Sequence, residues 1–77
     1  MSRLCLDALR RASGPLCNRD IALTLMTARG MDTDDDRLVG LMAKRVGCCL
    51  RGKRDEGFVA SEEGPGQTKV WRITRHP

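Results

Sequence analysis

Hydrophobic residues recur along the chain at intervals of three and four, with polar residues between them. This spacing is typical of amphipathic helices, and it predicts helices over residues 3–13, 18–29 and 34–56. Ser2 and Asn18 are favourable capping residues at the first two helix starts, and Gly30 suits the left-handed position that closes the second helix. An extended segment over residues 15–17 is expected to separate the first two helices.

The third helical segment is long for so small a protein. Its apolar stripe comprises Leu38, Leu41, Met42, Val46, Cys49 and Leu50. The second helix has a stripe of Ile21, Ala22, Leu25, Met26 and Ala28, and the first has Leu6, Leu9 and either Cys5 or Ala12. Thr33 followed by Asp36 resembles a capping box for the third helix, and the acidic run there suits a helix N-terminus. Gly40 and Gly47 weaken it, so the sequence also allows a kink, or a separate short helix over residues 34–42.

Two short alternating runs follow Gly57, which stops the third helix. A turn at residues 64–66 separates them, so a hairpin is predicted over residues 58–73. Trp71, in the second run, is expected to be the largest core side chain. The whole pattern predicts one mixed α+β domain over residues 1–77, with three helices and a two- to three-stranded antiparallel sheet.

Composition limits the core of this domain. Among 77 residues 40% are hydrophobic, but there is one Trp, one Phe and no Tyr. Such a core supplies about 3–5 kcal/mol of stability, so dimerisation or a protein partner remains an open possibility.

Charge is distributed unevenly along the chain. Residues 1–36 carry five Arg and six Asp, a net charge of −1, whereas residues 37–77 carry nine Lys or Arg and four acids, a net charge of +5. The cations of the third helix fall opposite its apolar stripe, and those at 37, 44 and 51 are seven residues apart and share one side. This asymmetry favours a polyanionic partner, although cations also serve solubility alone.

The four cysteines do not follow a metal-binding pattern. No pair has the Cys-x-x-Cys spacing, and the neighbours Cys48 and Cys49 point about 100° apart on a helix, so no zinc site is expected. We expect Cys5, Cys17 and Cys49 to be largely buried thiols. Cys48 falls on the polar face of the third helix. The sequence leaves three roles open for it: a contact residue, an oxidisable thiol or an inert surface group.

Three sequence segments carry a resemblance to a known family. They are Leu6-Asp7-Ala8-Leu9, then Gly14-Pro15-Leu16-Cys17-Asn18-Arg19-Asp20-Ile21-Ala22, then Val46 through Cys49-Leu50 to Gly57-Phe58-Val59. With the predicted element order, they resemble the winged helix-turn-helix DNA-binding domains of bacterial and phage transcriptional regulators. The resemblance covers nearly the whole chain.

This resemblance implies a small regulator that binds duplex DNA, with the third helix in the major groove and the hairpin wing on the backbone. Carried over by position, the DNA-contacting residues would be Arg19, Lys44, Arg45, Cys48, Arg51, Arg54, Gln67 and Lys69. Arginine suits bidentate guanine contacts, whereas Lys44 and Lys69 suit phosphates. No metal or cofactor is implied.

The same residues bear on two other functional classes. Four Asp between Gly30 and Met42 would be repelled by DNA, and a winged helix can instead serve as a protein-interaction or assembly module. An enzyme is not expected, because the chain has one His and no recognisable catalytic constellation. Without an apolar run of about 20 residues or a signal core, we expect a cytoplasmic protein, associated with the nucleoid if it binds DNA.

Overall fold

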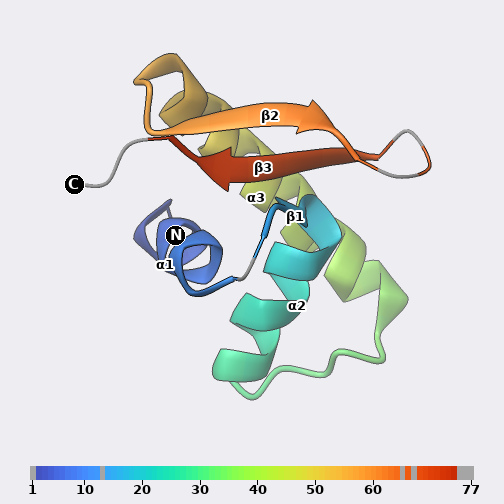
Figure 1. Cartoon of the computed structure of the whole chain (residues 1–77). Coiled ribbons are helices and arrows are strands. Elements are labelled where there is room, and N and C mark those ends of the chain that lie inside the picture. Colours follow the sequence, from blue (N-terminus) through green and yellow to red (C-terminus); the bar gives the residue numbers. More distant parts are fainter. Residues whose placement is uncertain (1, 13, 65, 67, 75–77) are drawn as a thin grey trace.

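The computed structural model describes residues 2–12, 14–64, 66 and 68–74, and it contains three helices and a three-stranded antiparallel sheet (Figure 1). The elements are α1 (Ser2–Arg11), β1 (Leu16–Cys17), α2 (Asn18–Ala28), α3 (Asp36–Asp55), β2 (Val59–Glu63) and β3 (Lys69–Ile73). The predicted α+β class is confirmed, and this order is consistent with a winged-helix layout. The predicted helices pass the observed ends by one or two residues, at Ala12, Arg29, Asp34, Asp35 and Glu56, and predicted residue 13 lies outside the described part of the chain.

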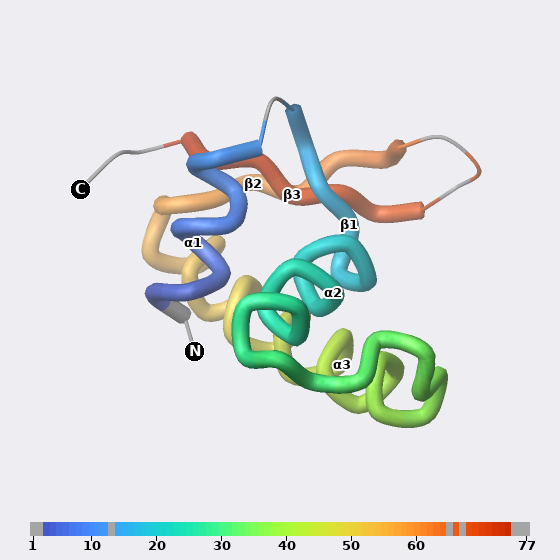
Figure 2. The backbone as a smooth tube through the Cα atoms, turned by 90° about the horizontal axis from the view of Figure 1, so that it is seen from below, coloured from blue at the N-terminus to red at the C-terminus, as the bar shows by residue number. Residues whose placement is uncertain are grey.

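Strand β3 lies in the middle of the sheet, in the order β1-β3-β2. Trp71 of β3 is paired with Leu16 on one side and with Ser61 on the other. Figures 1 and 2 show the turn end of the β2–β3 hairpin on the side of the molecule where α2 and α3 begin. The sheet thereby brings the middle of β3 close to the first turn of α2.

The core is formed by all three helices and the sheet. Its buried members are Cys5, Ala8, Leu9, Ile21, Ala22, Leu25, Met26, Val39, Met42, Val46, Leu50, Val59 and Trp71. Trp71 is 3% exposed, which confirms its predicted role. The stripe predicted for α3 was wrong at one edge, because Leu41 is 54% exposed and Val39 is fully buried. Ala28 is also exposed, beyond the last buried turn of α2.

Two glycines end the longer helices in the same way. Gly30 and Gly57 have positive φ angles of 70° and 87°. The next N–H in each case, from Met31 or Phe58, returns to a carbonyl five residues earlier, which is the Schellman arrangement. The Lys53 ammonium also lies 5.3 Å from the Phe58 ring centroid at the end of α3. Both predicted stop positions are therefore confirmed.

The helix starts differ from the predictions. Asp35, rather than Thr33, caps α3, and its Oδ1 accepts hydrogen bonds from the N–H groups of Arg37 and Leu38. Asn18 is the first residue of α2, and the N-cap Cys17 makes no side-chain capping bond. The side chain of Asn18 is engaged elsewhere, as described below. A hydrogen bond to a distant residue thus replaces the expected capping bond to a backbone N–H of the same helix.

Helix α3 is continuous over 20 residues, without the break that its glycines allowed. Gly47 is buried, and a Cβ atom built at this position would lie 2.9 Å from Asn18 Nδ2. This glycine is therefore explained by the close approach of α2, and no break in the helix is needed to account for it.

Candidate nucleic-acid interface

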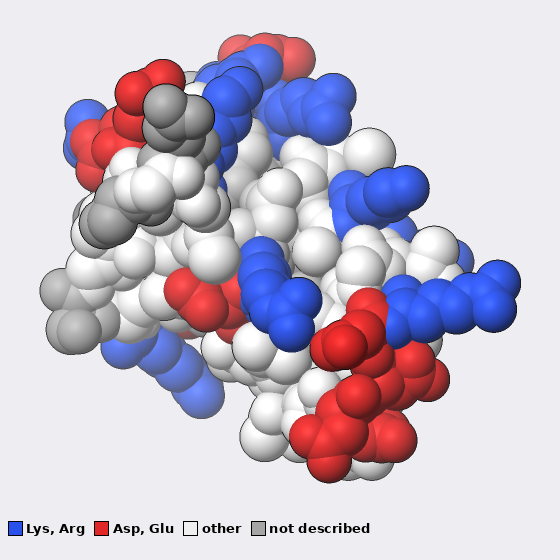
Figure 3. Space-filling model, turned by 90° about the vertical axis from the view of Figure 1, so that its right-hand side faces the viewer, with Lys and Arg blue, Asp and Glu red and all other residues white. Residues whose placement is uncertain are grey.

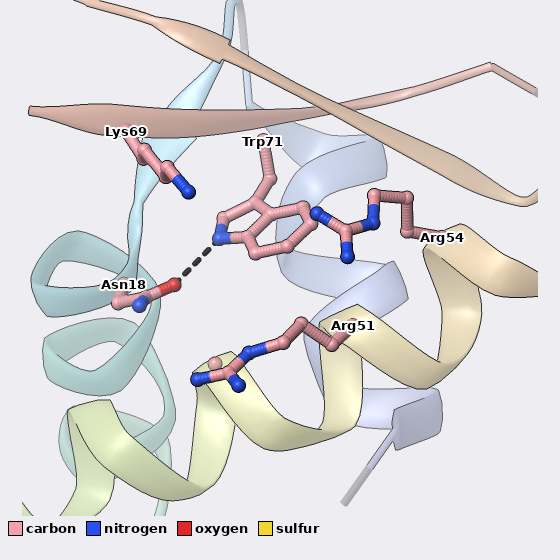
Figure 4. A pocket seen from close by; sticks show the side chains of 6 residues that line it. Asn18, Arg51, Arg54, Lys69 and Trp71 are labelled. Carbon is pink, nitrogen blue, oxygen red and sulfur yellow. Dashed lines mark hydrogen bonds between the residues drawn. The ribbon is translucent and has the colours of Figure 1, made fainter.

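A pocket of about 360 Å³ opens between α3, β3 and the start of α2 (Figure 4). It is lined by Asn18, Gly47, Arg51, Arg54, Lys69 and Trp71. Three of the predicted DNA-contacting residues, Arg51, Arg54 and Lys69, are brought together here from two elements distant in sequence. The pocket therefore lies where α3 meets the β2–β3 hairpin, which is the predicted wing.

The wall of this pocket is fixed by one side-chain hydrogen bond. The indole Nε1–H of Trp71 donates to Asn18 Oδ1 over 2.5 Å, joining β3 to the first turn of α2 (Figure 4). Because Gly47 has no side chain, the Asn18 amide can lie directly against α3. The Asn18 side chain therefore connects three elements at one position.

The charged groups around the pocket are all cationic. Arg51 and Arg54 are three residues apart on α3, and Lys69 approaches from β3 (Figure 4). None of the three forms a salt bridge with a described carboxylate, and no acidic residue lines the pocket. The N-terminal end of α2, which carries partial positive charge, borders the same space through Asn18.

The predicted contact residues on the preceding turns of α3 lie in a different hollow. Lys44, Arg45 and Cys48, with Cys49, line a shallow depression of about 420 Å³ on the surface of this helix. Leu41 is exposed one turn earlier. The outer face of α3 therefore combines cations with exposed apolar and thiol groups.

The remaining two predicted contact residues do not join either group. Arg19 is exposed, and its Nη2 atom lies 3.6 Å from an Oδ1 atom of Asp36, which links the starts of α2 and α3. Gln67 lies outside the described residues. Arg19 therefore already has an acidic partner, although both side chains are largely exposed to solvent.

Acidic groups lie on the same side of the molecule as the exposed cations of α3. Figure 3 shows basic side chains across the middle and upper right of this face, the largest group of acidic side chains at the lower right, and smaller acidic groups at the upper left, top and centre. The acidic run before and at the start of α3 consists of Asp32, Asp34, Asp35 and Asp36, all exposed. Asp32 Oδ1 accepts the Asp34 N–H and Asp35 caps α3, so part of this run is explained by local structure.

Ion pairing separates the described cations into two groups. Those with a carboxylate partner are Arg10, Arg19, Lys53 and Arg72. The cations on the exposed side of α3 and on β3 that form no salt bridge with a described carboxylate are Arg37, Lys44, Arg45, Arg51, Arg54 and Lys69. Arg3, Arg11 and Arg29 are also without a carboxylate partner among the described residues, so unpaired positive charge is greatest on α3 and β3 but is not confined to them.

Three pocket residues were not predicted as part of a site. The sequence predicts a helix cap at Asn18, a weak point of the helix at Gly47 and a core side chain at Trp71. Trp71 is in the core, but one edge of it also borders the pocket. Each of these expectations rests on local sequence, whereas the shared position of the three residues depends on tertiary contacts, among them the pairing of β3 with β1.

The cysteines are all free thiols. Cys5 is buried as predicted and Cys48 is exposed, whereas Cys17 and Cys49 are only half-buried. Burial, and to a smaller extent the nearby Cys49, raises the pKa of the Cys5 thiol from 9.0 to about 11. Among the described residues, no three His, Cys, Asp or Glu side chains are grouped to hold a metal ion.

This pKa shift predicts a loss of stability in alkaline solution. The unfolded thiol ionises near pH 9 and the folded one near pH 11, so stability should be complete below pH 9 and decline as pH rises towards 11. The shift corresponds to about 2–3 kcal/mol once both states have ionised. Urea unfolding at about pH 8 and about pH 10.5 should show a smaller decline for Cys5→Ala than for the wild type. Cys48→Ala is the matched control and should retain the wild-type decline, and equal declines in all three proteins would contradict the prediction.

None of the described helices is both long and apolar enough to cross a membrane. Comparisons of the chain with protein-family models, with curated proteins and with solved structures found no match. The winged-helix family therefore stays a prediction from the sequence, with which the observed order of helices and strands is consistent.

Proposed function

We propose that this protein binds duplex DNA, with the outer face of α3 in the major groove and the β2–β3 wing against the backbone. The observation that carries the proposal is the set of unpaired cations on α3 and β3 defined above. Cations without protein partners are free to replace the counterions of a phosphate backbone, which is the main source of affinity in such interfaces.

The shape of α3 supports the same proposal. At 1.5 Å per residue its 20 residues span about 30 Å, and its outer face is exposed along this length. The major groove is wide enough to admit one α-helix. Lys44 and Arg51 are seven residues apart and point to nearly the same side, so both would face the groove.

The acidic run limits how the duplex can lie. Asp34, Asp35 and Asp36 are exposed at the start of α3 and would repel phosphates. We therefore place the duplex along α3 from Lys44 onwards, towards the wing. Arg37, next to the acidic run, would then contribute little.

A salt titration of binding tests the proposed function. A fluorescently labelled duplex of mixed sequence should bind with micromolar affinity at low salt, as followed by anisotropy. If about four phosphates are neutralised, log K should fall with log salt concentration with a slope of about −3 to −4. Absence of binding at low salt would reject the proposal.

A protein-interaction module is the second candidate, and one observation favours it. Leu41 is 54% exposed beside the hollow lined by Lys44, Arg45, Cys48 and Cys49, and acidic groups border the same side of the molecule. An apolar side chain among mixed charges is common at protein interfaces. If no DNA binds, this surface becomes the leading candidate for the partner site.

A further inference from the structure

We infer that the pocket between α3 and the wing is a binding site for a single phosphate group. Its lining residues are Asn18, Gly47, Arg51, Arg54, Lys69 and Trp71, here called the phosphate pocket. The inference deepens the proposed function. If the phosphate comes from a DNA backbone, that assignment rests on the proposed DNA binding. The existence of the site does not depend on it.

The chemistry of the pocket selects an anion with several oxygen acceptors. Each polar side chain that lines it carries N–H donors, namely two guanidinium groups, one ammonium, one amide and the indole. The indole N–H is already used by Asn18 Oδ1, which leaves the Asn18 Nδ2 group as a further donor at the wall. Guanidinium groups form paired hydrogen bonds with phosphate oxygens, and the ammonium adds a point charge.

The pocket is held open by contacts that do not involve its cations. The Asn18–Trp71 hydrogen bond fixes the wall, and β3 is paired on both sides in the sheet. Trp71 is anchored in the core. The three cations therefore do not need to rearrange the backbone in order to meet a ligand, which lowers the entropic cost of binding.

Size restricts the ligand further. A volume of about 360 Å³ lies at the small end of the range for small-molecule sites. It accommodates one phosphate with part of the group attached to it. This phosphate group has two possible sources, a phosphodiester in the backbone of a duplex or a free phosphate in solution.

Trp71 makes the site directly measurable, because it is the single tryptophan of the chain and lines the pocket. The full chain is titrated with inorganic phosphate while chloride keeps the ionic strength constant, and tryptophan emission is recorded. We expect a saturable change. Arg54→Gln and Lys69→Gln should each weaken phosphate binding about tenfold or more, because each removes a charged hydrogen-bond donor.

Lys44→Gln is the matched control, because it removes one exposed cation of α3 that does not line the pocket. It should bind phosphate as the wild type does. All four proteins should have the same far-ultraviolet circular dichroism, since the substituted side chains are exposed. Absence of a saturable change in the wild type, or an equal loss in Lys44→Gln, would overturn the inference.

A second titration distinguishes the two sources of phosphate. If the backbone supplies it, a saturating short duplex with unphosphorylated ends should abolish the response to inorganic phosphate. If the response persists beside bound duplex, the pocket serves a free phosphate and the backbone assignment is overturned. A protein that binds phosphate but no duplex would reject the proposed function alone, and one that binds duplex but no phosphate would reject the pocket alone.

Discussion

Replacement of Trp71 by alanine is expected to leave a large fraction of the protein unfolded at room temperature. The side chain is 3% exposed and belongs to the central strand of the sheet, where it joins the core formed by the three helices. Truncation of a buried Trp typically costs about 3–5 kcal/mol. That is comparable to the whole stability expected of a domain with so small a core, about 3–5 kcal/mol. Far-ultraviolet circular dichroism with urea unfolding is the suitable measurement, because the variant has no tryptophan.

Two further variants separate burial from hydrogen bonding. Trp71→Phe keeps an aromatic ring but removes the donor to Asn18 Oδ1, and we expect a smaller loss, about 1–3 kcal/mol. Leu41→Ala removes an apolar side chain that is 54% exposed, and it should change stability by no more than about 0.5 kcal/mol. A Trp71→Ala protein with the wild-type unfolding midpoint would show that the core does not depend on β3.

The second large effect is expected at Arg51. This residue is both a member of the cation row along α3 and a lining residue of the phosphate pocket. Arg51→Glu would remove a contact to DNA and place a carboxylate beside Arg54 and Lys69. Loss of one such arginine contact costs about 1–3 kcal/mol. With the added repulsion, duplex affinity should fall about 100-fold or more at low salt, as measured by anisotropy.

Arg29→Glu is the control for this reversal, since it changes the net charge by the same amount. Arg29 is exposed at the C-terminal end of α2, outside both hollows of α3. If affinity depended only on total charge, the two variants would lose binding equally. That outcome would contradict a binding face built from α3 and the wing. Both side chains are exposed, so unfolding is not expected to obscure the comparison.

The parts of the fold that were predicted correctly depend on short stretches of sequence. Both glycine stops, at Gly30 and Gly57, and the burial of Ile21, Ala22, Leu25 and Met26 follow from local conformational preference and helical spacing. The edge of the α3 stripe was not predicted, because Leu41 and Val39 both fit an apolar face of 3.6-residue period. The position of α1 and α2 decides which of them is buried.

The candidate site was predicted only in part, because it too depends on contacts between segments that are distant in sequence. Arg51, Arg54 and Lys69 were expected on a basic helix and a wing, but the sequence did not indicate that they meet in one pocket. It also did not separate them from Lys44, Arg45 and Cys48, which line another hollow of α3. Arg19 carries the same formal charge as these residues, yet its partner Asp36 becomes apparent only in three dimensions.

The sequence by itself determined the order of the elements, the glycine stops at the C-terminal ends of the longer helices and the concentration of cations in the second half, because each depends on neighbouring residues. Only the tertiary structure decided the role of Asn18. Its side chain suits a helix cap locally, but the indole of Trp71, 53 residues away, takes its oxygen. A hydrogen bond between distant segments requires the pairing of the sheet and the packing of α2 on α3, and neither contact is determined by local spacing.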